Sequence, residues 1–339
     1  MKAYVGIDLH SSNSVVGIID ENNNQLFLKK LPNNLKQILL ALEQFKKIIV
    51  GIVIESTFNW YWLVDGLSEN GYHVHLSNPC ANKQYSGLKH CDDKKDSLWL
   101  ANLLRLDILK EGYVYPKKDR SVRDMLRRRI MFVQSRTQLI LSLQSMITRN
   151  LGIKKSCNDI KKLKKSDSLQ NLFDDSRLKL MAECYLDTII FLSTKIKIME
   201  KEIKSMAKLK KEFELLLTIN GVGNILALTI MLEVGDIGRF PKVGNFSSYS
   251  RCVSSIRTSD GKKKGEGNRK NGNKYLSWAF VEAANFSKRY CSKAQRFYQR
   301  KRSKTNEIVA TKALANKIAR ASYYIMRDKV PYDPEKLFG

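Results

Sequence analysis

The chain has 339 residues, of which 43% are hydrophobic, so it is long enough for two or three domains with buried cores. Its formal net charge is +27, yet residues 1–105 hold 11 basic and 10 acidic residues and are nearly neutral. A neutral N-terminal third before a strongly basic remainder favours nucleic acid as the partner, with a membrane surface a distant second.

The cysteine and hydropathy patterns indicate the cellular compartment in which the protein is expected. Six scattered cysteines form no Cys-x-x-Cys pair, which argues against a zinc ribbon or a disulfide framework. The sequence shows neither a signal segment nor an apolar run of membrane-spanning length. We therefore expect a cytoplasmic protein with reduced thiols and no membrane partner.

The N-terminal segment, residues 2–20, predicts two β-strands joined by a tight turn. Asp8 stands where the first strand should continue apolar. A carboxylate there is costly to bury unless it is paired or holds a cation, although an aspartate at a strand end can also simply cap the turn.

Alternating strands and helices follow. Residues 25–31 predict a strand and residues 35–45 a helix, and the apolar run 48–54 predicts a central strand that ends at Glu55. Ser56 and Thr57 are suited to cap a helix over 59–70, and a short strand is expected over 72–76.

A second pair of acids begins the next helix. Asp93 and Asp96 lie three residues apart and share one helix face, where acids also serve routinely as N-terminal caps. Together with Asp8 and Glu55 they form a set of four carboxylates that can hold two Mg²⁺ ions for phosphoryl transfer. This order of residue types is that of an RNase H-like, RuvC-like α/β domain.

The middle of the chain predicts two long helices, over 121–150 and 178–209, with a lysine-rich connection. They fit an antiparallel hairpin or coiled coil, which is either a spacer within one chain or, as we favour, a dimerisation arm. We therefore expect three domains: 1–117, 118–209 and 210–339.

The C-terminal part predicts a mainly α domain. It opens with a turn at Gly221-Val222-Gly223 that resembles a helix–hairpin–helix, whose backbone amides can face a phosphate. Further on, residues 250–304 hold 16 basic and 3 acidic residues around a glycine-rich loop. The candidate nucleic-acid-binding residues of this loop are Lys262, Lys263, Lys264, Arg269, Lys270 and Lys274. The loop either touches only backbone phosphates or holds a nucleophilic serine that a base or metal activates.

These motifs resemble those of the DEDD transposases of the IS110 class, which includes the Piv/MooV-like DNA invertases. The likeness covers nearly the whole length. It comprises Gly-Ile-Asp at 6–8, Glu-x-Thr at 55–57, Asp-x-x-Asp at 93–96, Gly-x-Gly at 221–223 and a serine loop at 258–276. Departures from the family pattern are Ser97 for an alanine, Thr258 for a serine, Asp260 for a glycine, and residues 251–254 for a Gly-Leu-x-Pro step.

The resemblance implies that Ser259 is the nucleophile and forms a phosphoserine link to DNA, with Thr258 as the fallback. It further implies assistance by Mg²⁺ at the four acids, a homo-oligomer (dimer or tetramer) with sites shared between protomers, and a structured guide RNA encoded by the element. Two alternatives remain: a RuvC-like nuclease that cuts with metal-activated water, and a former transposase kept for nucleic-acid binding.

Overall fold

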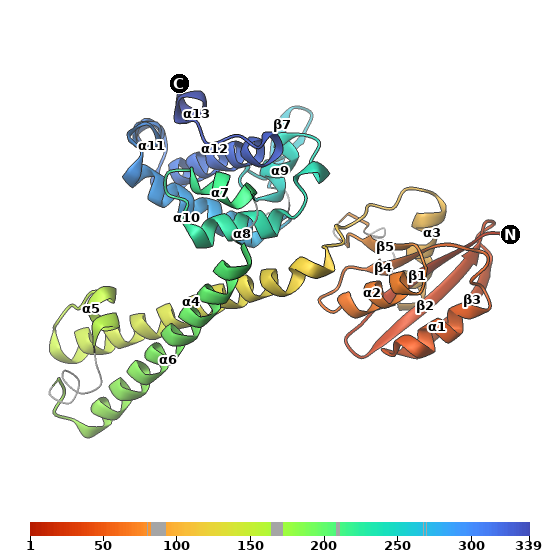
Figure 1. Ribbon diagram of the computed structural model, residues 1–339, viewed down its shortest axis with the longest axis horizontal. Coiled ribbons are helices and arrows are strands. Elements are labelled where there is room, and N and C mark those ends of the chain that lie inside the picture. Colours follow the sequence, from red (N-terminus) through yellow and green to blue (C-terminus); the bar gives the residue numbers. More distant parts are fainter. Residues whose placement is uncertain (80, 83–92, 164–171, 208–210, 267, 269) are drawn as a thin grey trace. The chain divides into compact units, whose positions relative to one another are not determined.

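The computed structural model describes residues 1–79, 81–82, 93–163, 172–207, 211–266, 268 and 270–339. The chain divides into two compact units, Met1–Lys117 and Lys118–Gly339, which we describe one at a time (Figure 1). No helix in the described residues is both long enough and apolar enough to cross a membrane.

The first unit is built on a five-stranded mixed sheet in the order β3-β2-β1-β4-β5. The strands are β1 (Ala3–Leu9), β2 (Asn13–Asp20), β3 (Gln25–Pro32), β4 (Ile49–Glu55) and β5 (Val74–Ser77). The first three pair antiparallel as a meander, whereas β4 runs parallel to both β1 and β5. This α/β sheet confirms the fold class expected for the N-terminal part.

Helices cover both faces of this sheet. Alternate residues of β1, Val5 and Ile7, pack with α1 (Leu35–Glu43) and α2 (Tyr61–Glu69) in one apolar core. The opposite face, on which Gly6 lies, is covered by α3 (Asp93–Arg105). Residues of even number in β1 therefore face α3.

The prediction that Ser56 and Thr57 cap α2 is wrong. The helix begins at Tyr61 after Trp60, which makes no capping hydrogen bond with its side chain. Thr57 instead donates its hydroxyl to Asn59 Oδ1 at 2.9 Å, and the Asn59 amide donates to the carbonyl oxygen of His10 at 3.0 Å. The polar residues after β4 thus brace the end of β1 and do not start a helix.

Two long antiparallel helices form an arm of the second unit (Figure 1). They are α4 (Lys117–Leu151) and α6 (Ser176–Ala207), and the short α5 (Cys157–Lys162) lies in their connection. Far from the C-terminal helices, the arm has an apolar core of its own, to which Ile140, Leu143, Leu186 and Ile189 contribute. Both long helices were expected from the apolar spacing.

A second, larger core joins the near end of this arm to the C-terminal helices. It combines Val122 and Leu126 of α4 and Ile203 of α6 with residues of the C-terminal helices. The C-terminal elements are α7 (Lys211–Leu217), α8 (Asn224–Val234), η1 (Ile237–Arg239), α9 (Val243–Tyr249), β6 (Arg257–Ser259), β7 (Lys262–Gly265), α10 (Lys274–Tyr290), α11 (Ser292–Lys304), α12 (Glu307–Asp328) and α13 (Pro334–Phe338). The mostly helical C-terminal region agrees with the sequence prediction.

A buried ion pair ties α4 to the C-terminal helices. Glu233 of α8 is 2% exposed and accepts two hydrogen bonds from Arg127, at 2.6 and 2.7 Å. The Asn273 amide donates to the same carboxylate at 2.7 Å, while its oxygen caps the first turn of α10. One carboxylate thus joins three helices, and its loss leaves the half-buried Arg127 guanidinium and the buried Asn273 amide without their partner.

We expect Glu233→Ala to destabilise the protein by about 3 kcal/mol, because it leaves a half-buried charge and a buried amide unpaired. Chemical denaturation of both variants measures the effect. Asp328→Ala is the matched control, since Asp328 pairs with Arg327 at 2.6 Å but the two side chains are 41% and 48% exposed, and its loss should be far less destabilising. Equal losses in the two variants would contradict the assigned role of Glu233.

Candidate active site

The alternation of β-strand side chains brings the acids of the first unit together. Asp8 has the same parity as Gly6 and therefore faces α3, as does Glu55 at the end of the parallel neighbour β4. Asp8 is 3% exposed and shares a hydrogen bond with Glu55. Two carboxyl groups from adjacent strand ends are thus in contact.

Helix α3 brings the other two acids to the same edge. It lies very close to the sheet, because a Cβ on Gly6 would lie 1.9 Å from the Ser97 carbonyl oxygen. Ser97, where the family has alanine, is fully buried and donates its hydroxyl to Lys94 O at 2.9 Å. Asp93 and Asp96 occupy the first turn of the helix, as predicted.

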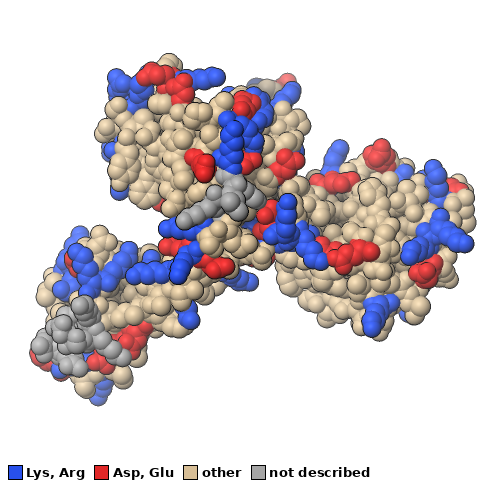
Figure 2. Space-filling model, in the orientation of Figure 1, with Lys and Arg blue, Asp and Glu red and all other residues tan. Residues whose placement is uncertain are grey.

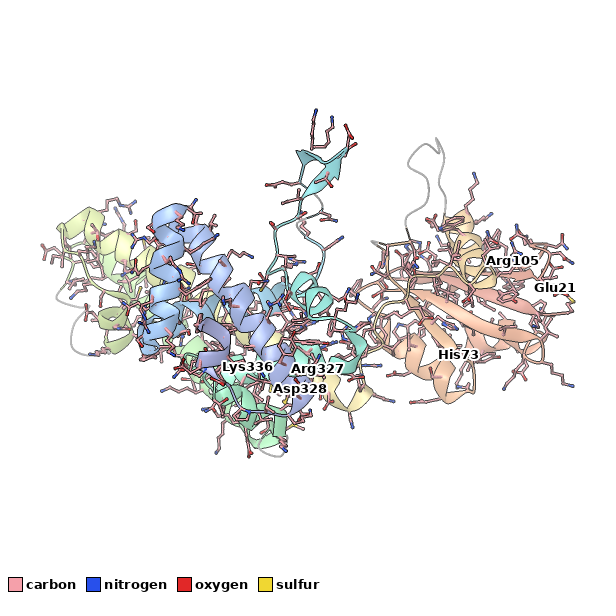
Figure 3. All side chains as sticks on the ribbon, turned by 90° about the horizontal axis from the view of Figure 1, so that it is seen from above. Glu21, His73, Arg105, Arg327, Asp328 and Lys336 are labelled. Carbon is pink, nitrogen blue, oxygen red and sulfur yellow. The ribbon has the colours of Figure 1, made fainter. Side chains whose placement is uncertain are left out.

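The C-terminal end of α3 is fixed by a separate contact. Arg105 donates to the carbonyl oxygen of Glu21 at 3.2 Å, in the connection between β2 and β3 (Figure 3). The helix is therefore held to the sheet at its middle and at its far end. This placement sets the position of its first turn and of the two acids on it.

His10 joins this cluster, and the sequence reasoning did not single it out. Its Nε2 lies 3.1 Å from Asp8 Oδ2 and 3.2 Å from Asp93 Oδ2. Ligand atoms of these three residues all lie within 4.8 Å of one another. The available signal was the spacing Asp8-Leu9-His10, because residues two apart near a strand end point to the same face.

The crowding of acids changes the protonation of Asp8. Burial, followed by the hydrogen bond with Glu55, raises the pKa of Asp8 from 3.8 to about 7. The negative charges of Glu55 and Asp96 act in the same direction, while His10 lowers the pKa. The site therefore has an excess of negative charge that a divalent cation would neutralise.

The residues present fit such a cation. They offer carboxylate oxygens, which magnesium prefers, and one imidazole nitrogen. The Nε2 atom of His10 is buried and has no hydrogen-bond partner among the described residues. A buried polar atom directed at two carboxylates is what a ligand set presents before its ion binds.

The predicted nucleophile lies in the second unit, on a β-hairpin that sequence reasoning treated as a loop. Strands β6 and β7 pair Ser259 with Lys262, and the hairpin projects from the helices of its unit (Figure 3). The turn residues Asp260 and Gly261 have φ of 51° and 66°. Aspartate followed by glycine is a favoured pair for such a turn, so Asp260 fits where the family has glycine.

Ser259 and Thr258 are both exposed. No hydrogen bond of the Ser259 hydroxyl is found within the described part of the chain. A serine hydroxyl is a weak nucleophile without a base or metal beside it. Among the described residues of this unit, no base therefore contacts the Ser259 hydroxyl through a hydrogen bond.

The base of the hairpin segment is closed by backbone contacts. Asn273 N donates to Tyr249 O at 2.6 Å, and a Cβ on Gly272 would lie 2.4 Å from the same oxygen. Arg251, one of the departures from the family pattern, bonds Gly272 O at 2.9 Å as well as Lys270 O. The segment that carries the serine is thus anchored at both ends, as predicted.

The candidate nucleic-acid-binding residues lie on this hairpin and in the segment that follows it. Lys262, Lys264, Lys270 and Lys274 are exposed, and Lys274 begins α10 with its Nζ 5.1 Å from the Tyr275 ring centre. Arg269 and the side chain of Lys263 lie outside the described residues. Figure 2 shows further Lys and Arg side chains gathered along the helical arm of the second unit.

The turn at Gly221 to Gly223 lies at the start of α8, as expected. Gly221 has a φ of 93°, and its Cβ position would lie 2.4 Å from Ser287 N, so both conformation and close packing require glycine. The turn borders a shallow pocket that includes Lys204, Phe286 and Tyr290. A phosphate contact at this turn stays a prediction.

Comparison with known proteins shows what parts of these two units are similar to. Residues 5–150 match a transposase family model of the DEDD type from IS110 elements, a type that implies an RNase H-like fold. Residues 213–299 match a second model, described as the transposase IS116/IS110/IS902 family. Two separate stretches of the chain are therefore similar to IS110-type transposases.

A curated relative points the same way. The chain is 25% identical over 233 residues to the transposase for insertion sequence element IS1111A of Coxiella burnetii (strain RSA 493 / Nine Mile phase I). The match covers 67% of this chain and 62% of that protein, which is less than two thirds of its length. The four acids and His10 fall in the first matched domain, and Ser259 falls in the second.

Proposed function

We propose that this protein is a transposase that cleaves and rejoins DNA through a covalent link to Ser259, assisted by Mg²⁺ at Asp8, Glu55, Asp93 and Asp96. The single observation that carries the proposal is the convergence of acids from two strand ends and one helix start in a DEDD transposase domain. Bound there, a divalent cation would stabilise the attacking and leaving oxygens of the phosphoryl group.

The chain's own residues have separate tasks in this reaction. Ser259 Oγ attacks a DNA phosphorus, the bond from phosphorus to the leaving strand's oxygen breaks, and that oxygen takes up a proton, while the serine proton passes to solvent. Attack by a strand hydroxyl on the phosphoserine then rejoins DNA and restores the serine. The exposed lysines of the hairpin segment, such as Lys262 and Lys264, hold the backbone phosphates nearby.

The exposure of Ser259 supports the sharing of sites between protomers of a homo-oligomer. Its hydroxyl has no hydrogen-bond partner among the residues described in its own unit, while the acid cluster is assembled in the other unit. An exposed hairpin tip can reach an acid cluster in another copy of the chain. We further propose that a structured noncoding RNA from the element selects the DNA, which the large positive charge of residues 118–339 supports.

The same observation also favours a second function. An acid cluster complete with His10 within one unit can activate water and cut DNA without any serine. This protein would then be a RuvC-like nuclease with no covalent step. The two functions differ in one product, the protein–DNA adduct.

An adduct assay therefore tests the proposal. Full-length protein, element-end DNA, Mg²⁺ and co-purifying RNA are mixed, denatured and separated on a gel. We expect an adduct with wild type and Thr258→Ala and none with Ser259→Ala. Metal-dependent cleavage that Ser259→Ala leaves intact would favour the nuclease. An adduct that is lost only in Thr258→Ala would show that Thr258, and not Ser259, is the nucleophile.

A further inference from the structure

The backbone of His10 is held by three separate segments. Its amide donates to Asn13 O at 2.9 Å, and its carbonyl oxygen accepts from Asn33 Nδ2 and Asn59 Nδ2, each at 3.0 Å. The three hydrogen bonds come from three different segments of the chain, so the backbone of His10 is fixed from several sides. This anchoring restricts where the imidazole can lie.

The imidazole points its Nε2 atom into the acid cluster. The side chain as a whole is 39% exposed, but Nε2 is inaccessible to solvent and lacks a hydrogen-bond partner among the described residues, despite two carboxylate oxygens at 3.1 and 3.2 Å. Neighbouring donors on an octahedral ion with bonds of about 2.1 Å lie about 3.0 Å apart. The observed separations match that spacing.

We propose that His10 Nε2 is a direct ligand of the cation held by Asp8 and Asp93, which gives this site a mixed nitrogen and oxygen donor set. The inference rests on the proposed metal-dependent function and adds a ligand to it. Magnesium prefers oxygen ligands and water, whereas first-row transition cations also bind imidazole well. The site therefore favours Mn²⁺ over Mg²⁺ more strongly than four carboxylates alone would.

The competing interpretation is that His10 is an imidazolium that only neutralises the two acids. A charged imidazole would form ion pairs with both carboxylates at these distances, whereas a neutral imidazole would bind the ion through the same Nε2 atom. The two interpretations differ in a spectroscopic property of the bound ion, since only a ligand places a nitrogen nucleus in contact with the metal electrons.

Pulsed electron paramagnetic resonance of full-length protein with Mn²⁺ tests the proposal directly. We expect a nitrogen coupling in wild type that is absent in His10→Asn and His10→Gln. His73→Asn is the matched control, because His73 is exposed and its ring contacts His75. Titrations with MnCl₂ and MgCl₂ should show the Mn²⁺ affinity of His10→Asn reduced about tenfold or more, and the Mg²⁺ affinity reduced less.

Three outcomes overturn the proposal, and they can be told apart. Mn²⁺ bound with no nitrogen coupling, and released by Asp8→Asn, would show a site of oxygen ligands alone and leave the proposed function intact. Equal losses of Mn²⁺ and Mg²⁺ affinity would remove the claimed preference. No binding of Mn²⁺ to wild type would overturn the metal-dependent function together with this inference.

Discussion

Asp8→Asn is expected to reduce DNA cleavage by about three orders of magnitude or more and, at the same time, to stabilise the metal-free protein at pH 8. The loss of activity follows because the amide removes the buried carboxylate from the proposed metal site, where a cation supplies several kcal/mol of transition-state stabilisation. The gain in stability follows because Asp8 is 3% exposed and crowded by other acids, so its charge is unfavourable without a cation.

The pH dependence has a definite sign. The pKa of Asp8 is raised from 3.8 in the unfolded chain to about 7 in the folded protein, so the folded state binds the proton more tightly. Its contribution to stability is complete below about pH 4 and is lost as the pH rises to about 7. The asparagine side chain does not ionise, so the variant escapes this loss.

Thermal unfolding in EDTA at pH 5 and pH 8 measures the difference. Wild type should lose more stability between these pH values than Asp8→Asn does, by an amount on the order of a few kcal/mol. Glu43→Gln is the control, since Glu43 is exposed on α1 and should follow wild type. Added Mg²⁺ should raise the wild-type melting temperature and leave that of Asp8→Asn unchanged. If all three proteins lost the same stability between pH 5 and pH 8, the raised pKa of Asp8 would be contradicted.

Gly6→Ala is expected to have a large effect on the first unit, although it touches no charged group. The new methyl would lie 1.9 Å from Ser97 O and 2.7 Å from Ala101 N, both backbone atoms of α3. Because neither atom belongs to a flexible side chain, the helix itself must move. That movement displaces Asp93 and Asp96, so we expect a loss of about 4 kcal/mol or more of stability and of metal binding together.

Calorimetry should therefore show a loss of stability in Gly6→Ala, and metal titration should show a loss of metal affinity in the same variant. Gly112→Ala serves as the matched control, because a Cβ there meets Leu76 O at an ordinary 3.4 Å. It should change the free energy of unfolding by about 0.5 kcal/mol or less. If Gly6→Ala retained both the stability and the metal affinity of wild type, the close packing of α3 on β1 would be refuted.

Local patterns predicted much of the first unit. The apolar alternation around Asp8, the buried run that ends at Glu55 and the helical spacing after Asp93 are short-range signals, and they led to the correct elements. The convergence of these side chains depends on strand order and on two glycines, Gly6 and Gly17, that let α3 approach. A glycine pair directly opposite each other is visible only once the register is known.

Other features could not be predicted because a residue type suited to one role has another role in the folded chain. Ser56 and Thr57 are good caps by residue type, but the segment instead supports the His10 carbonyl through Asn59. His10 itself was overlooked because a histidine after a strand is common, and only its distances to two carboxylates set it apart. The Asp260-Gly261 turn carried a hairpin signal that the surrounding glycines and lysines concealed.

The central claim is that the acid cluster and Ser259 act in one reaction, and mapping of the trapped adduct tests it most directly. Wild type, Asp8→Asn and Ser259→Ala are incubated with element-end DNA, Mg²⁺ and co-purifying RNA, digested, and analysed by mass spectrometry for nucleotide-linked peptides. The account predicts a nucleotide on the peptide at Ser259 in wild type and on no peptide in either variant. A nucleotide on Ser259 in Asp8→Asn at the wild-type level would contradict it, because the serine would then act without the acids.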